Sequence, residues 1–142
     1  LKPLTSVSHR IEIWFVSVER ASERPFLGWG LDAARKVPPS ETVIGTRVTG
    51  NIGLHSHNAP INLLLELGVF GLALGAATTF AIGRKLSMAS GEPAVVAALT
   101  AIFVAAFLIA NVSFGVFQSW WIGSLFLTAA IARVAASQTS AR

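Results

Sequence analysis

The chain contains no cysteine and few charged residues. Its 142 residues include 11 Lys or Arg and 7 Asp or Glu, so charged residues make up 13% of the sequence. An ordinary soluble domain carries about 25%. The absence of cysteine excludes a disulfide framework and a cysteine-bound metal. With 53% hydrophobic residues and a mean hydropathy of +0.63, the composition predicts a membrane protein.

The opening stretch, LKPLTSVSHR, has neither an initiator methionine nor the basic, apolar and small-residue regions of a signal peptide. We therefore expect the chain to be part of a longer protein. The net charge of +4 would favour nucleic acid as a partner in a soluble protein. In a membrane protein basic residues instead report topology, so no nucleic-acid partner is expected.

Three long apolar runs occupy the second half of the chain: residues 60–83, 93–111 and 118–136. At 1.5 Å per residue, the first run is long enough to cross a hydrocarbon core about 30 Å thick. Pro93 opens the second run, where its missing N–H is tolerated in a first helical turn. The runs predict three transmembrane helices.

The residues that flank these runs predict their orientation. Trp120 and Trp121 open the third run as an aromatic pair typical of a membrane interface. Four basic residues fall on the opposite side, which is the cytoplasm by the positive-inside tendency: Arg84, Lys85, Arg133 and Arg142. We therefore expect residues 1–58 to lie in the periplasm and residues 137–142 to form a cytoplasmic tail.

An amphipathic helix is predicted over about residues 8–24, and we expect it to lie along the membrane surface. Pro25 ends it, since the residue before a proline is disfavoured in a helix. Residues 31–54 lack a convincing period and predict a long loop. The predicted fold class is all-α, a polytopic membrane fragment with this periplasmic segment followed by three transmembrane helices within residues 59–136. The amphipathic helix over residues 8–24 is predicted because apolar residues recur at i, i+3, i+4 and i+7: Ile11, Trp14, Phe15 and Val18.

Two of the three histidines stand directly before the first apolar run, in GLHSHNAPINLLLELGVFG at residues 53–71. Asn58 suits the N-cap of a helix that begins at Ala59. His55 and His57 would then lie beside the positive end of the helix dipole, where neutral imidazole is favoured. Neutral histidine can accept a proton from a hydroxyl nucleophile. The pair is therefore either a catalytic feature or an interfacial one that satisfies headgroups or a backbone carbonyl.

The stretch SHRIEIWFVSVERASERPFLGWGLD, followed after a loop by HSHNAPINLLLELGVFGLAL, resembles the O-antigen ligase and polysaccharide polymerase family of bacterial inner-membrane proteins. The shared pattern is an Arg ahead of a Trp, a Pro followed by Gly-x-Gly, then His-x-His-Asn and Leu-Glu-x-Gly-x-x-Gly. It covers about residues 8–75, and the later spans fit the family by hydropathy. Family members are much longer, so the resemblance implies a C-terminal portion.

The resemblance implies transfer of a glycan from a polyprenyl-pyrophosphate carrier to a sugar hydroxyl. The acceptor is lipid A core for a ligase, or another carrier-linked glycan for a polymerase. Membrane lipids are a further expected partner, the active site is expected to face the periplasm, and neither a metal nor another cofactor is implied. Such a reaction needs a base for the acceptor proton and cations for the departing pyrophosphate.

The resemblance also assigns roles to individual residues. The histidine of the His-Asn step matches His57, expected to be the base or to orient the acceptor, and His55 is the second candidate. The arginine ahead of the tryptophan matches Arg10, whose planar fork of donors suits pyrophosphate. Three further cations of the outer loop either add to this clamp or are solvated: Arg35, Lys36 and Arg47.

Asn58 and Glu66 complete the expected substrate-binding residues. Glu66 would lie roughly 9 Å along the helix from Pro60, where an ionised carboxylate needs a partner or a cavity. It could pair with Arg10, orient His57, or meet an arginine elsewhere in the protein.

Small and polar residues elsewhere have simpler interpretations. Gly68, Gly71 and Gly75 predict a close contact between helices rather than chemistry. Asn111 and Gln118 bracket the outer hairpin and could contact the carrier or a sugar.

Other classes of protein are weighed against this interpretation. A metal hydrolase built on His55 and His57 lacks ligands, because His9 is the one remaining histidine. A transporter would carry more polar residues within its spans. A non-catalytic membrane fragment, a polymerase and a protein-glycosylating relative all stay open.

Overall fold

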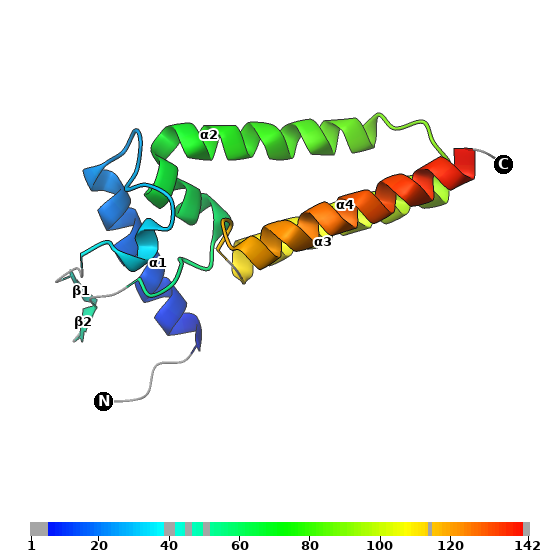
Figure 1. Ribbon diagram of the computed structural model, residues 1–142. Helices are drawn as coiled ribbons and strands as arrows, with labels where there is room; N and C mark the ends of the chain where they lie inside the picture. Colours follow the sequence, from blue (N-terminus) through cyan, green and yellow to red (C-terminus); the bar gives the residue numbers. More distant parts are fainter. Residues whose placement is uncertain (1–5, 39–41, 45–46, 50–51, 114, 141–142) are drawn as a thin grey trace.

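A computed structural model describes residues 6–38, 42–44, 47–49, 52–113 and 115–140 (Figure 1). Four long helices account for most of these residues. One turn of 3-10 helix and a short strand pair lie between the first two. In chain order the elements are α1 (Ser6–Glu23), η1 (Ala33–Arg35), β1 (Thr42–Ile44), β2 (Arg47–Thr49), α2 (Ala59–Ser87), α3 (Pro93–Val112) and α4 (Ser119–Ser140).

The predicted N-terminal helix is α1, and the face that it buries within the protein is a second one, distinct from the predicted stripe. Trp14 packs against the core, whereas Ile11, Phe15 and Val18 are 41%, 59% and 47% exposed. The helix carries two apolar faces, and packing against Leu65 of α2 buries the other one. The placement of the exposed face on a membrane surface stays a prediction. The buried residues of α1 are Ile13, Val16 and Ala21.

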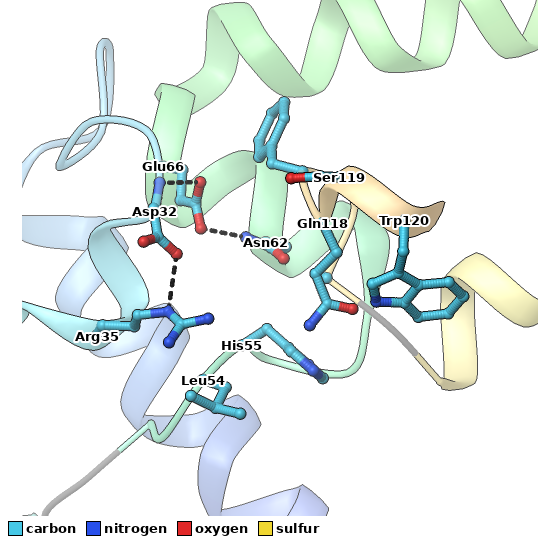
Figure 2. Close-up of a pocket in the computed structure, with 11 residues that line it drawn as sticks. Asp32, Arg35, Leu54, His55, Asn62, Glu66, Gln118, Ser119 and Trp120 are labelled. Atoms are coloured by element: carbon cyan, nitrogen blue, oxygen red, sulfur yellow. Dashed lines mark hydrogen bonds and ion pairs between the residues drawn. The ribbon is translucent and has the colours of Figure 1, made fainter. Parts of the chain in front are cut away.

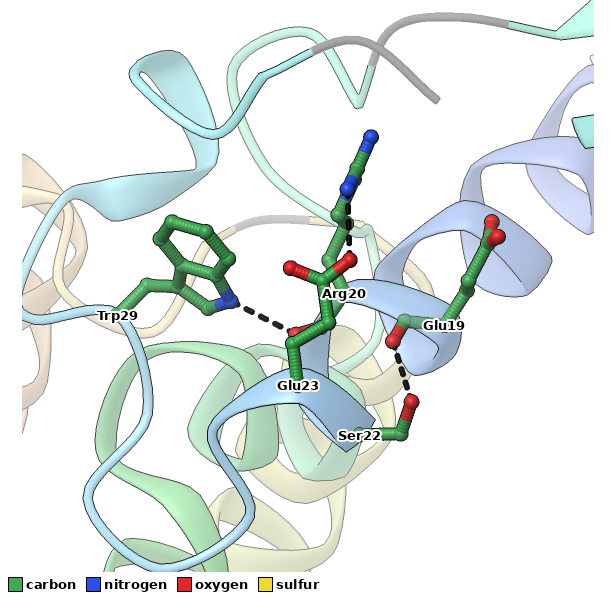
Figure 3. A network of polar contacts seen from close by, with 5 residues as sticks. All are labelled: Glu19, Arg20, Ser22, Glu23 and Trp29. Carbon is green, nitrogen blue, oxygen red and sulfur yellow. Dashed lines mark hydrogen bonds and ion pairs between the residues drawn. The ribbon is translucent and has the colours of Figure 1, made fainter. Parts of the chain in front are cut away.

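α1 ends at Glu23, two residues before Pro25, as the proline predicts. The indole Nε1 of Trp29 folds back and donates to the carbonyl of Arg20 at 2.7 Å (Figure 3). This bond satisfies one of the carbonyls that a helix end leaves without a partner. The guanidinium of Arg24 lies 4.1 Å from the centroid of the Trp29 ring, in cation–π geometry. These contacts hold the turn that follows α1 against the end of the helix.

The predicted loop over residues 31–54 contains short elements of its own. η1 follows Asp32, whose φ of 57° is in the left-handed region. β1 and β2 form an antiparallel pair in which Val43 lies opposite Val48. The all-α prediction missed these strands, because three residues are too few for an alternating pattern to be recognised.

α2 is broken at Gly68, whose φ of 66° and ψ of −161° are not helical. Residues with a side chain rarely adopt such a φ. The break deprives the carbonyls of Leu65 and Glu66 of their usual donors four residues on. The backbone N–H groups of Trp29 and Gly30 replace those donors, at 2.9 Å each.

The contact between the turn and the break is reciprocal. The backbone N–H of Val69 donates to the carbonyl of Pro25 at 2.8 Å. A Cβ on Gly28 would overlap the backbone of Glu66, so this close approach requires glycine. The Pro/Gly-x-Gly stretch and the Leu-Glu-x-Gly stretch therefore bind each other, in an arrangement we name the glycine interlock.

The nearest neighbours of the glycines expected to make a close contact between helices are other parts of this chain. Gly68 forms the break, and Cβ atoms built on Gly71 and Gly75 meet side chains of α2 itself, those of Leu67 and Leu63. Contacts of these glycines with another helix stay a prediction.

Helices α2 and α3 are long and apolar enough to cross a membrane. Both begin as predicted, α2 with Asn58 as N-cap and α3 with Pro93 in its first turn. The described apolar part of α4, Ser119–Val134, is shorter, so the third span stays a prediction. α3 and α4 run side by side, and α2 diverges from them toward the end where α1 lies (Figure 1).

Candidate functional site

A cavity of about 550 Å³ lies where η1, the start of α2 and the connection between α3 and α4 meet (Figure 2). Sites for small molecules usually occupy about 300–1,000 Å³. We name this space the histidine cavity. Its side chains include Asp32, Arg35, His55, Asn62, Glu66, Gln118 and Trp120.

Glu66 is buried, with 3% of its surface exposed, and both of its oxygens are bonded. Oε1 accepts from Nδ2 of Asn62 at 2.7 Å, and Oε2 accepts from the backbone N–H of Asp32 at 2.8 Å. The carboxylate of Asp32 then accepts from Nε of Arg35 at 3.1 Å. Among the described residues Glu66 thus bonds Asn62 and Asp32 rather than Arg10 or His57, because the glycine interlock brings the turn before η1 directly over this carboxylate.

His55 and His57 face each other, with ring centroids 4.1 Å apart and ring planes at 70°. Their i, i+2 spacing permits this because both precede α2 rather than lying on it. His55 is 8% exposed. Burial lowers the pKa of His55, and the nearby charges of His57 and Arg35 lower it further. His55 is therefore neutral near pH 7, and its Nδ1 makes no hydrogen bond with any described residue.

His57 is held by the end of α3. Its Nδ1 lies 2.7 Å from the carbonyl oxygen of Ser113. Because a carbonyl can only accept, Nδ1 carries the proton of the neutral ring. Nε2 is left as the acceptor, which is the form that a general base requires.

Arg10 reaches the same helix end from α1. Its Nη1 donates to the carbonyl of Val112, the last residue of α3, at 2.7 Å. A helix C-terminus carries unpaired carbonyls and the negative end of the dipole, which favours N–H donors and cations. The structure thus brings the predicted base, His57, and the predicted clamp, Arg10, to adjacent carbonyls, although neither lines the histidine cavity.

The other predicted binding residues are placed differently. Arg35 lines the histidine cavity, Lys36 is exposed, and the side chain of Arg47 in β2 lies outside the described residues. The side chain of Asn58 accepts from the backbone N–H of Ile61 at 3.1 Å, so it caps α2. Over the part of the chain that the structure describes, no group of three His, Cys, Asp or Glu residues is placed to hold a metal ion.

Some residues of the histidine cavity were not recognised from the sequence, and one was suggested only as a sugar or carrier contact. Trp120, interpreted as an interface residue, lines the histidine cavity, and so does Asp32. Gln118, suggested as a sugar contact, also lines it, and its Oε1 is buried without a described partner. Gly115 packs so tightly that an added Cβ would lie 2.9 Å from Cβ of His55. The short polar stretch between the last two apolar runs was the available signal.

A second space, which we name the apolar groove, lies between α2, α3 and α4 with a volume of about 620 Å³. Residues that are neighbours in the sequence line the two spaces. Asn62 and Trp120 line the histidine cavity, whereas Leu63 and Trp121 line the apolar groove. Its other lining residues include Phe103, Phe107 and Leu125.

The family model described as O-Antigen ligase matches residues 2–76. Two curated proteins named "Putative polysaccharide ligase" are also similar to the chain. That of Rickettsia conorii is 27% identical over 122 residues, which cover 84% of this chain and 29% of the relative. That of Rickettsia bellii is 29% identical over 122 residues, which cover 84% and 30%. The chain thus spans less than a third of these relatives, and no solved structure matches it.

Proposed function

The chain belongs to the O-antigen ligase family, and we propose that it forms part of an enzyme that transfers a glycan from a polyprenyl-pyrophosphate carrier to a sugar hydroxyl of lipid A core. One observation carries this proposal, the meeting of His57 and Arg10 at the C-terminal end of α3. A base and a cation are the two requirements of the reaction.

His57 acts as the general base. Its Nε2 accepts the proton of the acceptor hydroxyl while that oxygen attacks the anomeric carbon of the donor sugar. The bond between the anomeric carbon and the pyrophosphate oxygen breaks, and its electron pair leaves with the pyrophosphate. The bond from Nδ1 to the carbonyl of Ser113 supports this role, because it holds the ring and selects the tautomer.

Arg10 stabilises the negative charge that develops on the departing pyrophosphate. Guanidinium suits this task because its planar fork of donors binds two phosphate oxygens at once. The bond from Nη1 to the carbonyl of Val112 supports a fixed orientation of the group. The isoprenoid chain of the carrier occupies the apolar groove, whose lining is compatible with a hydrocarbon.

The reaction takes place on the periplasmic face of the bacterial inner membrane. Arg84 and Lys85 lie in the last turn of α2, at the end remote from the histidines, and by the positive-inside tendency this end is cytoplasmic. The third apolar helix, α4, is the third span of this unit.

Glycan transfer by membranes that carry the complete protein tests the proposal. We expect His57→Ala and Arg10→Ala to lower transfer by about 10²- to 10⁴-fold at equal protein levels. His9→Ala is the matched control, because His9 is exposed on α1 beside Arg10, and it should retain normal transfer. Near-normal transfer by both site variants would rule out the assigned roles and leave a non-catalytic membrane fragment.

The product of the same assay separates the two acceptors of the family. A ligase adds glycan to lipid A core, whereas a polymerase lengthens carrier-linked chains. Loss of core modification in His57→Ala supports the proposal, and loss of chain length alone assigns the chain to the polymerase alternative.

A further inference from the structure

The histidine cavity holds two buried polar atoms without a described partner. They are Nδ1 of His55, whose side chain is more than nine-tenths buried, and Oε1 of Gln118. A buried polar atom left unpaired costs about 1–3 kcal/mol, so these atoms favour a ligand that bonds them. An amide oxygen needs a donor, and a neutral imidazole nitrogen needs either a donor or an acceptor. A hydroxyl group serves both atoms.

The charges of the cavity do not suit a phosphate. Two carboxyl groups, those of Asp32 and Glu66, line it together with the guanidinium of Arg35. The Nε of Arg35 already donates to Asp32 at 3.1 Å. Since the lining offers no excess positive charge, an anion would gain little there, and an uncharged ligand fits better.

One wall of the cavity is aromatic. Trp120 lines it from the start of α4, and the residue is 52% exposed. Figure 2 shows Trp120, Gln118 and His55 around one space. A sugar ring has C–H groups on its faces and hydroxyl groups on its edge. Its C–H groups pack on the negative face of an aromatic ring while its hydroxyls bond polar groups nearby.

The cavity also adjoins the proposed base. The ring centroids of His55, which lines the cavity, and of His57, which lies behind it, are 4.1 Å apart. Arg10, assigned to the pyrophosphate, is not among the lining residues. The donor sugar must stay with its pyrophosphate, which leaves this cavity to the acceptor.

We propose that the histidine cavity is the subsite for an uncharged sugar ring of the acceptor, packed on Trp120 and hydrogen-bonded through its hydroxyls to Gln118 and His55. The assignment rests on the proposed glycan transfer. Trp120 and Gln118 are specificity-determining residues in it, and His55 delivers the reacting hydroxyl toward His57.

Sugar binding can be measured without transfer, by saturation-transfer NMR on the complete protein in detergent. The probes are methyl hexopyranosides and a phosphate-free core oligosaccharide. We expect binding in the wild type and in His57→Ala, and roughly tenfold weaker binding in Trp120→Ala and Gln118→Ala. Trp120→Phe keeps an aromatic face and should keep most of the binding, which shows that the loss in Trp120→Ala is not a folding defect.

Two controls on α4 match these substitutions. Phe126→Ala removes an aromatic ring that is 74% exposed, and Gln138→Ala removes a glutamine about 30 Å along the helix from Gln118. Both should bind sugar as the wild type does. Unchanged binding in Trp120→Ala and Gln118→Ala, or no binding of any probe to the wild type, overturns the subsite.

Transfer kinetics separate this subsite from the proposed function. The cavity variants should raise the KM for the acceptor about tenfold and leave the KM for the carrier-linked donor unchanged. A rise in the donor KM alone overturns the assignment to the acceptor. Sugar binding that depends on Trp120 in a protein without any transfer activity contradicts the proposed function and retains the sugar site.

Discussion

The backbone N–H of Asp32 donates to Oε2 of Glu66 at 2.8 Å, across 34 residues of sequence. This bond ties the turn before η1 to the first part of α2, beside the glycine interlock. It also places Arg35 on the wall of the histidine cavity, because Asp32 accepts from Nε of that arginine. The carboxylate of Glu66 therefore holds together the elements that form the histidine cavity.

Replacement of Glu66 tests this structural role. Glu66→Ala leaves the N–H of Asp32 and the amide of Asn62 without their acceptor, and we expect a loss of about 2–4 kcal/mol in the free energy of unfolding. Glu66→Gln keeps one oxygen acceptor and should lose less. Glu23→Ala is the control, since its pair with Arg20 is a surface one worth about 0–1 kcal/mol. Thermal unfolding in detergent measures all three, and equal stability of Glu66→Ala and wild type would contradict the role.

The glycine interlock predicts unequal effects of glycine substitution. A Cβ on Gly68 would overlap the carbonyl of Phe26, and its φ of 66° disfavours any side chain. We expect Gly68→Ala to destabilise the protein by about 3 kcal/mol or more. A Cβ added at Gly123 in α4 meets no described atom within 4 Å apart from its own stretch of helix backbone. Gly123→Ala should therefore be neutral or stabilise the protein by up to about 1 kcal/mol. Similar stabilities of the two variants in detergent unfolding would exclude the interlock.

The buried His55 predicts a loss of stability in acid. Its pKa is lowered in the folded protein from the ordinary value of 6.5, by burial and then by the charges of His57 and Arg35. The unfolded chain therefore takes up a proton first as the pH falls, so the contribution of His55 is complete above pH 6.5 and declines below it.

Thermal unfolding between pH 8 and pH 5, a window of about one and a half units on either side of the ordinary histidine pKa, measures this effect. His55→Gln should flatten the decline, whereas His9→Gln, on the exposed face of α1, should leave it unchanged. An unaltered pH profile in His55→Gln would show that another group governs the acid loss.

The absence of cysteine from this chain makes its topology easy to test. We expect Leu54→Cys, at a position that is 57% exposed beside the histidines, to react with an impermeant maleimide in intact cells after outer-membrane permeabilisation. Ser90→Cys, exposed in the connection between α2 and α3, should react only after the inner membrane is opened. The reverse pattern would place the histidines in the cytoplasm and contradict the positive-inside prediction.

Local features of the chain were predictable from short stretches of sequence. The apolar runs predict α2 and α3, because helix length and hydropathy are properties of consecutive residues. Asn58 as a cap and Pro25 after α1 were also predicted, since both act on their own neighbouring backbone. The pairing of His55 with His57 followed from their two-residue spacing in an extended segment.

The site itself depends on contacts between residues far apart in the chain. The apolar stripe through Phe15 was predicted for the membrane surface, but no local pattern indicated that a second face of α1, with Val16, packs against α2. Likewise no local signal paired Glu66 with Asp32 or indicated that Trp120 and His55 line one cavity.

The sequence by itself determined the membrane class, the helices and the family motifs, because composition, periodicity and capping act over a few turns. The tertiary structure alone decided how those motifs meet. The left-handed backbone of Gly68 frees two helical carbonyls, and the turn after α1 closes on them only when the chain is folded. The meeting of His57 and Arg10 at the end of α3 has the same origin, since unpaired carbonyls at a helix end attract donors from any part of the chain.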